Sequence, residues 1–202
     1  MTIVYAVNDG LYVNLTNRCP CACKFCIRNN ADGAYGSSSL WLEREPDAGE
    51  VIAAIDEAGP RRFAEIVFCG YGEPTERLDV LLAVAGWLKS AYPQLPVRVN
   101  TNGLADLIAG ESVAARFEGL VDALSVSLNA ASAEEYFALC SPRFGIGSYE
   151  AILRFAQSAK RYVPSVAMTV VATQDFTEAK LSACRAVCDR IGVALRVREQ
   201  IT

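Results

Sequence analysis

Four cysteines lie within eight residues, from Cys19 to Cys26, directly after an apolar run. Cys19, Cys23 and Cys26 have the spacing C-x-x-x-C-x-x-C, and Cys21 is left over. Three thiolates without a nearby histidine suit an iron–sulfur cluster, and a four-iron cluster with three protein ligands keeps one iron free for a substrate or cofactor. The spacing also leaves open a structural zinc site that uses all four cysteines.

The composition of the whole chain excludes several classes of catalytic and metal site. The 202 residues include no histidine, which excludes Ser-His-Asp and Cys-His catalysis and mixed Cys/His zinc sites. The net charge is −4 and the acidic residues are spread along the chain, so we expect no nucleic-acid or membrane surface. The N-terminus has no secretory pattern, and the longest apolar run, residues 80–88, is too short to span a bilayer. These features predict a cytoplasmic protein with reduced cysteines.

The elements that must position the thiols alternate regularly. Six short apolar runs with β-branched residues are expected to form strands at residues 11–16, 64–69, 97–101, 123–128, 166–172 and 193–197. Helices are expected after Asp47 and Ser132, each the first residue of a capping box, and from Ser148. Further helical patterns cover residues 78–87, 109–117 and 177–191. No linker or repeat divides the chain, so a single domain over residues 1–202 with a parallel sheet is predicted.

Polarity along the strands bears on the shape of the sheet. Ser125 and Ser127 alternate with apolar neighbours, and so do Arg196 and Arg198. This alternation indicates one apolar face that packs on helices and one polar face that lines a cavity. Six units are fewer than the eight of a closed barrel, so we predict an α/β fold, an open partial (β/α)6 TIM-like barrel, with its site at the C-terminal ends of the strands. A flattened doubly wound sheet is the alternative.

Four motifs follow the first four predicted strands in order. They are the C-x-x-x-C-x-aromatic-C that contains Phe25, then Gly70-Tyr71-Gly72-Glu73-Pro74, Asn100-Thr101-Asn102-Gly103 and Val126-Ser127-Leu128-Asn129. In this order they resemble the motifs of the radical S-adenosylmethionine enzymes, and the resemblance covers nearly the whole chain. A Gly-Glu-Pro or a Thr-Asn-Gly by itself is more often only a turn, so the order and the cysteine spacing carry the resemblance.

The resemblance implies a role for each matching residue. Cys19, Cys23 and Cys26 would hold a 4Fe-4S cluster. The aromatic residue of the cysteine motif would lie beside the adenine of S-adenosylmethionine, and the glutamate of the second motif would offset the charge of its ammonium group. The residues implied to contact this cofactor are Phe25, Gly72, Glu73, Thr101, Ser127 and Arg143.

The resemblance also implies a reaction. One electron from an external donor such as flavodoxin or ferredoxin would cleave S-adenosylmethionine to methionine and a 5′-deoxyadenosyl radical, which abstracts hydrogen from a substrate. Such an enzyme is oxygen-sensitive. The sequences of residues 21–30 and 39–43 resemble those of the small radical enzymes associated with TatD-type nucleases. This group has no assigned reaction.

The substrate is predicted only as a chemical class. Arg196 and Arg198 on the last strand suit a carboxylate or phosphate, and the alternative is that they pair with Glu199. The short chain leaves no room for a covering domain, so a macromolecular substrate is a further expectation. Residues 28–44, which include Trp41, are a candidate lid.

A second class of function stays open, a metal-binding or electron-transfer module that uses the cysteines from Cys19 to Cys26 and catalyses nothing. Cys184 and Cys188, four residues apart, and Cys140 are predicted to be helix packing residues. Cys69 could line the site or be a small buried residue.

Overall fold

The computed structural model describes residues 1–29, 32–173 and 176–199, and its centre is one sheet. Within these ranges the sheet has seven strands, arranged in the order in which they occur along the chain. Strands β2 to β7 are parallel, and β1 is antiparallel to β2. The strands are β1 (Val4–Val7), β2 (Gly10–Val13), β3 (Glu65–Phe68), β4 (Val97–Thr101), β5 (Ala123–Ser127), β6 (Ser165–Ala172) and β7 (Ala194–Glu199).

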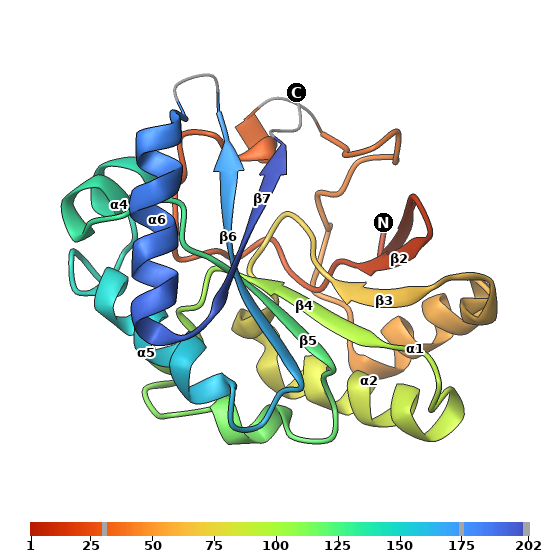
Figure 1. Ribbon diagram of the computed structural model, residues 1–202. Coiled ribbons are helices and arrows are strands. Elements are labelled where there is room, and N and C mark those ends of the chain that lie inside the picture. Colours follow the sequence, from red (N-terminus) through yellow and green to blue (C-terminus); the bar gives the residue numbers. More distant parts are fainter. Residues whose placement is uncertain (30–31, 174–175, 200–202) are drawn as a thin grey trace.

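Helices cover the outer face of the sheet, with α1 and α2 below β3 and β4 and with α5 and α6 beside β6 and β7 in Figure 1. The α-helices are α1 (Ala48–Glu57), α2 (Leu78–Ala91), α3 (Ala105–Ala109), α4 (Ala133–Cys140), α5 (Ser148–Ala159) and α6 (Glu178–Ile191). Single 3-10 turns, named η1 to η4, occur at Ile27–Asn29, Pro60–Arg62, Pro74–Arg77 and Ala114–Phe117.

The strand order separates the two predicted folds. A doubly wound sheet reverses its order at a switch point, which places helices on both faces. Here each parallel strand lies beside the preceding one, and right-handed crossovers then put successive helices on the same face. The sheet is curved and not closed, so the predicted open, TIM-like partial barrel is confirmed and the flattened alternative is wrong.

The polarity argument also holds for the two faces of the strands. Leu124 and Val126 are buried in the core between sheet and helices. Their neighbours Ser125 and Ser127 point the other way, where Ser125 contacts Arg196 and Ser127 lines a cavity. Alternation with a period of two therefore gives this curved sheet an apolar outside and a polar inside.

Strand β1 was not predicted. It forms a hairpin with β2 through Asn8 and Asp9, and Asn8 has a φ of 52°, which asparagine tolerates in such turns. The sequence signal was present, because Asn8-Asp9-Gly10 follows a run rich in valine. The hairpin adds Tyr5 to the inner side of the sheet, where it lines a cavity.

One helix prediction was wrong. A helix over 109–117 was expected, but α3 ends at Ala109 because Gly110 takes a φ of 74° and closes the helix. The side chain of Asp106 then accepts a hydrogen bond from the backbone N–H of Val113 at 2.9 Å, and η4 follows.

The capping prediction for α1 is confirmed. Asp47 Oδ1 accepts from the N–H of Glu50 at 2.9 Å, and Glu50 Oε2 accepts from the N–H of Asp47 at 3.0 Å. Ser132 similarly accepts from the N–H of Glu135 at 3.2 Å. Across the described ranges, no helix combines the length and the apolar composition needed to cross a membrane.

Candidate functional site

The cysteine loop, residues 19–26, is fastened to the end of α4. The N–H groups of Ala22 and Lys24 donate to the carbonyl oxygens of Cys140 and Leu139, each at 3.0 Å, and the N–H of Arg143 donates to Pro20 at 2.8 Å. The last carbonyls of an α-helix have no partner inside the helix, so the loop satisfies them. Helix α4 thereby holds a loop that is distant in sequence.

Cys19, Cys23 and Cys26 line one cavity of about 250 Å³, the cysteine cavity. All three are partly buried and free of disulfides. Cys21 is only 6% exposed, its Sγ lies 4.0 Å from the hydroxyl of Tyr136, and it is not on the cavity wall. Cys21 therefore lies off the wall that the other three cysteines form, although its thiol also interacts with those of Cys19 and Cys23.

Glu73 lies on the wall of the cysteine cavity and is 3% exposed. Its Oε1 accepts from the N–H of Thr75 at 3.1 Å and from the hydroxyls of Thr75 and Thr101 at 2.8 and 2.7 Å. Its Oε2 accepts from the N–H of Asn102 at 2.6 Å. The pKa of the Glu73 carboxyl is raised above its ordinary value, because the effect of burial exceeds the opposing effect of these hydrogen bonds. Glu73 thus ties the turn after β3 to the turn after β4 and keeps acceptor capacity at Oε2.

Gly72 permits the second motif to lie directly against the chain that leads into the cysteine loop. A Cβ at this position would lie 2.2 Å from the carbonyl oxygen of Thr16 and 2.6 Å from that of Arg18. The N–H of Glu73 donates to the same Arg18 carbonyl at 2.8 Å. The absence of a side chain at Gly72 is therefore a requirement of this contact.

Tyr71, which replaces a glycine common in the second motif, is accommodated away from this contact. Its ring is 3% exposed and meets the ring of Trp41 edge-on at 5.1 Å.

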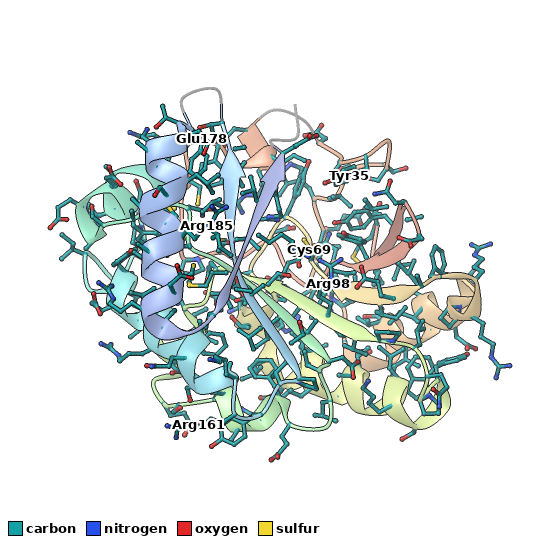
Figure 2. All side chains as sticks on the ribbon, viewed as in Figure 1. Tyr35, Cys69, Arg98, Arg161, Glu178 and Arg185 are labelled. Carbon is teal, nitrogen blue, oxygen red and sulfur yellow. The ribbon has the colours of Figure 1, made fainter. Side chains whose placement is uncertain are left out.

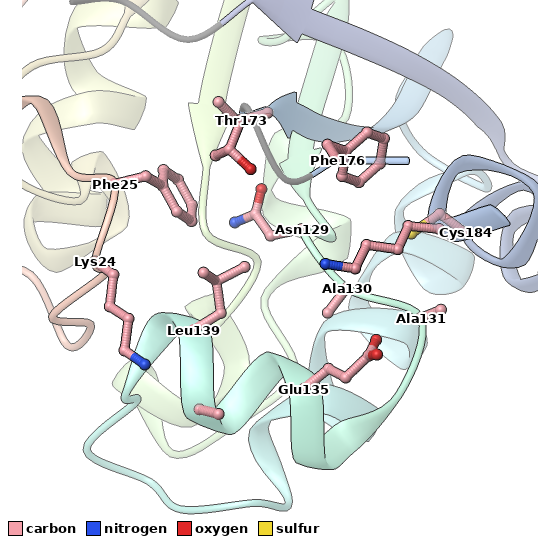
Figure 3. Close-up of a pocket in the computed structure, with 13 residues that line it drawn as sticks. Lys24, Phe25, Asn129, Ala130, Ala131, Glu135, Leu139, Thr173, Phe176 and Cys184 are labelled. Atoms are coloured by element: carbon pink, nitrogen blue, oxygen red, sulfur yellow. The ribbon is translucent and has the colours of Figure 1, made fainter. Parts of the chain in front are cut away.

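A second cavity, of about 300 Å³, adjoins the cysteine cavity at Phe25 and Val171, which line both. Figure 3 shows Phe25, Asn129 and Thr173 directed toward its interior. Asn129 has a φ of 61°, and its amide nitrogen donates to the Sγ of Cys140 at 3.6 Å. Its Oδ1 is buried without a hydrogen-bond partner among the described residues, which indicates a place for a donor on a ligand.

The structure brings most of the sequence-predicted residues together. Phe25, Gly72, Glu73, Thr101 and Ser127 line the cysteine cavity with the three thiols. Phe25, Gly72 and Glu73 come from the loops after β2 and β3, whereas Thr101 and Ser127 are the last residues of β4 and β5.

Arg143 lies elsewhere. Its side chain is 54% exposed, pairs with Glu76 at 3.3 Å and covers the ring of Phe144 at 4.7 Å. It is not among the residues that line the cysteine cavity.

Arg196 and Arg198 point to the inner side of the sheet and line a third cavity of about 350 Å³, which we call the arginine cavity. The predicted lid, residues 28–44, includes residues 30–31, which lie outside the described residues. The described remainder is fastened to the barrel, since Asn17 exchanges two hydrogen bonds with the backbone of Leu42 at 2.7 and 3.0 Å. Tyr35 and Leu40 of this segment form a wall of the arginine cavity.

Sequence reasoning gave no role to several wall residues. Asn129 belongs to the fourth motif, but the motif predicted no role for this residue. Tyr35, Val171 and Thr173 belong to no sequence motif. They reach the cavity walls only through the way the chain folds, which the sequence pattern does not show. Cys69, for which two roles were considered, lines both the cysteine and the arginine cavities. Cys140, Cys184 and Cys188 are buried in the core, as predicted.

The fold and the site define the class of protein: an open α/β barrel with three thiols in a loop at the C-terminal ends of its strands. A family model described as the Radical SAM superfamily matches residues 13–181, so the chain belongs to this superfamily of enzymes. Membership implies an iron–sulfur cluster and S-adenosylmethionine. No curated protein matches the chain.

Solved structures of the same fold include a radical SAM methyltransferase from Sphaerobacter thermophilus, with a TM-score of 0.67 and 21% identity. The alignment covers 97% of this chain and 57% of that one. Native anSMEcpe with bound AdoMet has a TM-score of 0.63 and 15% identity, with coverage of 94% and 50%. Methylornithine synthase has a TM-score of 0.61 and 14% identity, with coverage of 95% and 53%. The chain thus spans roughly half the length of these proteins, and the likeness concerns the fold.

The residues present fit the two groups that the family implies. Three free thiols share one cavity wall with a buried carboxylate that keeps acceptor capacity. No three cysteine, aspartate or glutamate side chains in the described part of the chain form a group that could hold a single metal ion. An iron–sulfur cluster is larger than one ion and holds its thiolates further apart.

Proposed function

We propose that the chain cleaves S-adenosylmethionine reductively at a 4Fe-4S cluster held by Cys19, Cys23 and Cys26. One-electron cleavage of the cofactor's sulfur–carbon bond supplies a 5′-deoxyadenosyl radical, which abstracts hydrogen from a substrate. The observation that supports this most is the shared cysteine cavity, because it unites residues of four separate motifs with the three thiols. Chance motif matches would not be expected to meet in space.

The residues of the chain are proposed to bind and orient S-adenosylmethionine. Glu73 is proposed to accept a hydrogen bond from the methionine ammonium at Oε2, and Gly72 allows the backbone beside it to approach the cofactor. Phe25 and Asn129 are proposed to hold the adenosine part in the second cavity, where the amide oxygen of Asn129 accepts from a hydroxyl. Thr101 and Ser127 supply further hydroxyls to the cavity wall.

Arg143 has a different proposed role from the one expected. Its pairing with Glu76 and the hydrogen bond from its N–H to Pro20 support a positioning role for the cysteine loop. We do not assign it to the cofactor carboxylate.

The wider setting is also a proposal. An external one-electron donor such as flavodoxin or ferredoxin is required, since the reaction consumes an electron. The eight cysteines and an oxygen-sensitive cluster suit the reducing cytoplasm. Residues 21–30 and 39–43 support placement among the TatD-associated radical enzymes. A gene neighbourhood without a TatD-type nuclease in any close relative would remove that placement.

The test uses anaerobically reconstituted protein with Cys19→Ala, Cys23→Ala, Cys26→Ala and, as the matched control, Cys21→Ala. Each of the first three variants should lose most of the iron and the 5′-deoxyadenosine formed on reduction with S-adenosylmethionine. Cys21→Ala should keep both, because this thiol lies against Tyr136 outside the cavity.

Two outcomes would contradict the proposal. Zinc instead of iron, with equal dependence on Cys21, would establish the four-cysteine zinc site. A fully loaded, reduced cluster that forms no 5′-deoxyadenosine would leave an electron-transfer module.

A further inference from the structure

The arginine cavity adjoins the cysteine cavity and carries an unbalanced charge. The two cavities share wall residues, among them Tyr35, Cys69 and Arg198. Figure 2 shows Cys69 and Arg98 close together on the inner side of the sheet. Three arginines, Arg98, Arg196 and Arg198, line the arginine cavity.

Arg98 is neutralised within the protein. Its guanidinium forms two hydrogen bonds with the carboxylate of Glu65, one of them from Nε at 2.9 Å. A further nitrogen donates to Asn100 Oδ1 at 2.9 Å. Most donors of Arg98 are therefore occupied, and its charge is offset.

Arg196 and Arg198 are not neutralised in this way. Arg196 donates to the hydroxyl of Ser125 at 2.7 Å, and no carboxylate in the described part of the chain forms an ion pair with it or with Arg198. Arg198 Nε is buried without a hydrogen-bond partner within the described ranges. Glu199, the alternative partner considered from the sequence, lines the cysteine cavity instead.

Positive charges lie close together at the arginine cavity. Burial and the neighbouring guanidinium groups of Arg98 and Arg198 lower the pKa of Arg196. Arg196 is exposed and Arg198 is half-buried, so solvent screens much of this repulsion, and the two guanidinium groups keep donors free for a ligand.

We infer that the arginine cavity binds an oxyanion group, a carboxylate or a phosphate, of a small-molecule substrate through Arg196 and Arg198. This inference rests on the proposed function, because the adjoining cysteine cavity is taken as the place of reaction. A cavity of about 350 Å³ suits a small molecule. Tyr5, Tyr12 and Tyr35 provide an aromatic wall for the rest of that molecule.

The test measures anion binding directly, by calorimetry on the anaerobic protein with and without saturating S-adenosylmethionine. Inorganic phosphate and malonate are the two probes, so that a phosphate site is distinguished from a carboxylate site. The variants are Arg196→Gln and Arg198→Gln. Arg185→Gln is the matched control, because Arg185 is an exposed residue on α6 away from the cavity (Figure 2).

At least one probe should bind wild-type and Arg185→Gln protein alike, and each of the two cavity variants should bind it about tenfold or more weakly. Binding should persist with S-adenosylmethionine present, which separates this site from the one for the cofactor's own carboxylate. The melting temperature of unliganded Arg196→Gln should be equal to or above that of the wild type, because like-charge repulsion is relieved. Should either glutamine variant fail to fold, Arg196→Lys and Arg198→Lys should show the same weakening to a smaller degree.

The inference is overturned if neither probe binds, if both cavity variants bind like wild type, or if S-adenosylmethionine abolishes the binding. The first of these outcomes, with 5′-deoxyadenosine still formed, would direct attention to a neutral or macromolecular substrate and leave the proposed function intact. Anion binding without cleavage of S-adenosylmethionine would do the reverse.

Discussion

Polar residues in this site form hydrogen bonds mainly with one another. Glu73 shows this most clearly, because one buried carboxylate accepts four hydrogen bonds from two different turns. An acidic residue in a Gly-Glu-Pro motif is expected to meet a cation, but here its first task is structural. The same contacts that order the turns also leave the charge of Glu73 at the wall of the cavity.

Replacing Glu73 with glutamine keeps the size of the side chain but removes its negative charge and one of its acceptor oxygens. The amide nitrogen cannot accept a hydrogen bond, so at least one buried donor among Thr75, Thr101 and Asn102 loses its partner. We expect a loss of about 1–3 kcal/mol in the free energy of unfolding, measured with urea, together with weaker binding of S-adenosylmethionine. Glu118→Gln on the exposed surface is the control and should change stability by less than about 0.5 kcal/mol. An unchanged Glu73→Gln protein would show that these hydrogen bonds contribute little.

At the scale of elements, loops after neighbouring strands are pressed together by backbone contacts. The turn after β3 lies against residues 16–18, and the cysteine loop lies against the end of α4. Both contacts are made mainly by the backbone, and of the proposed cluster ligands the Cys23 thiol also donates to the carbonyl oxygen of Cys140 at 3.9 Å. The site is thus assembled before any ligand arrives, which reduces the ordering cost of binding.

Gly72→Ala tests the closest of these contacts. The added methyl group meets the backbone of Thr16 and Arg18, which cannot rotate away, so we expect a loss of about 1–3 kcal/mol in urea unfolding of the protein without cluster. Gly86→Ala in α2 is the matched control. Its Cβ would have only an ordinary contact, 3.9 Å from Leu120, and alanine should raise stability by about 0.5–1 kcal/mol. A Gly72→Ala protein as stable as wild type would mean that the two loops separate easily.

At the scale of the whole molecule, three adjoining cavities lead from the space beside α4 and α6 to the inner side of the open barrel. The second cavity meets the cysteine cavity at Phe25, and the cysteine cavity meets the arginine cavity at Cys69 and Arg198. This order suits an extended cofactor in the first two cavities with a substrate beside it in the third. The wall on the open side comes partly from the segment that contains Tyr35 and Leu40.

Binding of S-adenosylmethionine should therefore stabilise the whole fold, and it should do so through the cluster. At a cofactor concentration of about 100 times its dissociation constant, the free energy of unfolding should rise by about 2.7 kcal/mol in cluster-loaded protein. The measurement is the melting temperature under anaerobic conditions. Protein with the cluster removed by a chelator serves as the control and should gain clearly less. An equal gain in both samples would show that the cofactor is held without the iron.

The sequence by itself determined the class of fold and predicted which three thiols would line one site. Hydrophobic runs of period two, capping residues and the alternation of Ser125 and Ser127 with apolar neighbours are local properties, and local properties can be seen in a sequence. The cysteine spacing and the motif order likewise need no coordinates. The same local reasoning misjudged residues 109–117, where one glycine in a left-handed conformation ends the helix at Ala109.

Only the tertiary structure decided which residues share a cavity. It showed that Arg143 pairs with Glu76, that the Cys21 thiol contacts the Tyr136 hydroxyl and that the cysteine loop donates to carbonyls at the end of α4. All three contacts join parts of the chain that are far apart in sequence. It also showed that Arg98 is neutralised by Glu65 while Arg196 and Arg198 are not. The physical reason is that charge balance and cavity walls depend on the curvature of the sheet, which brings β4 and β7 to face one space, and spacing along the chain does not contain that information.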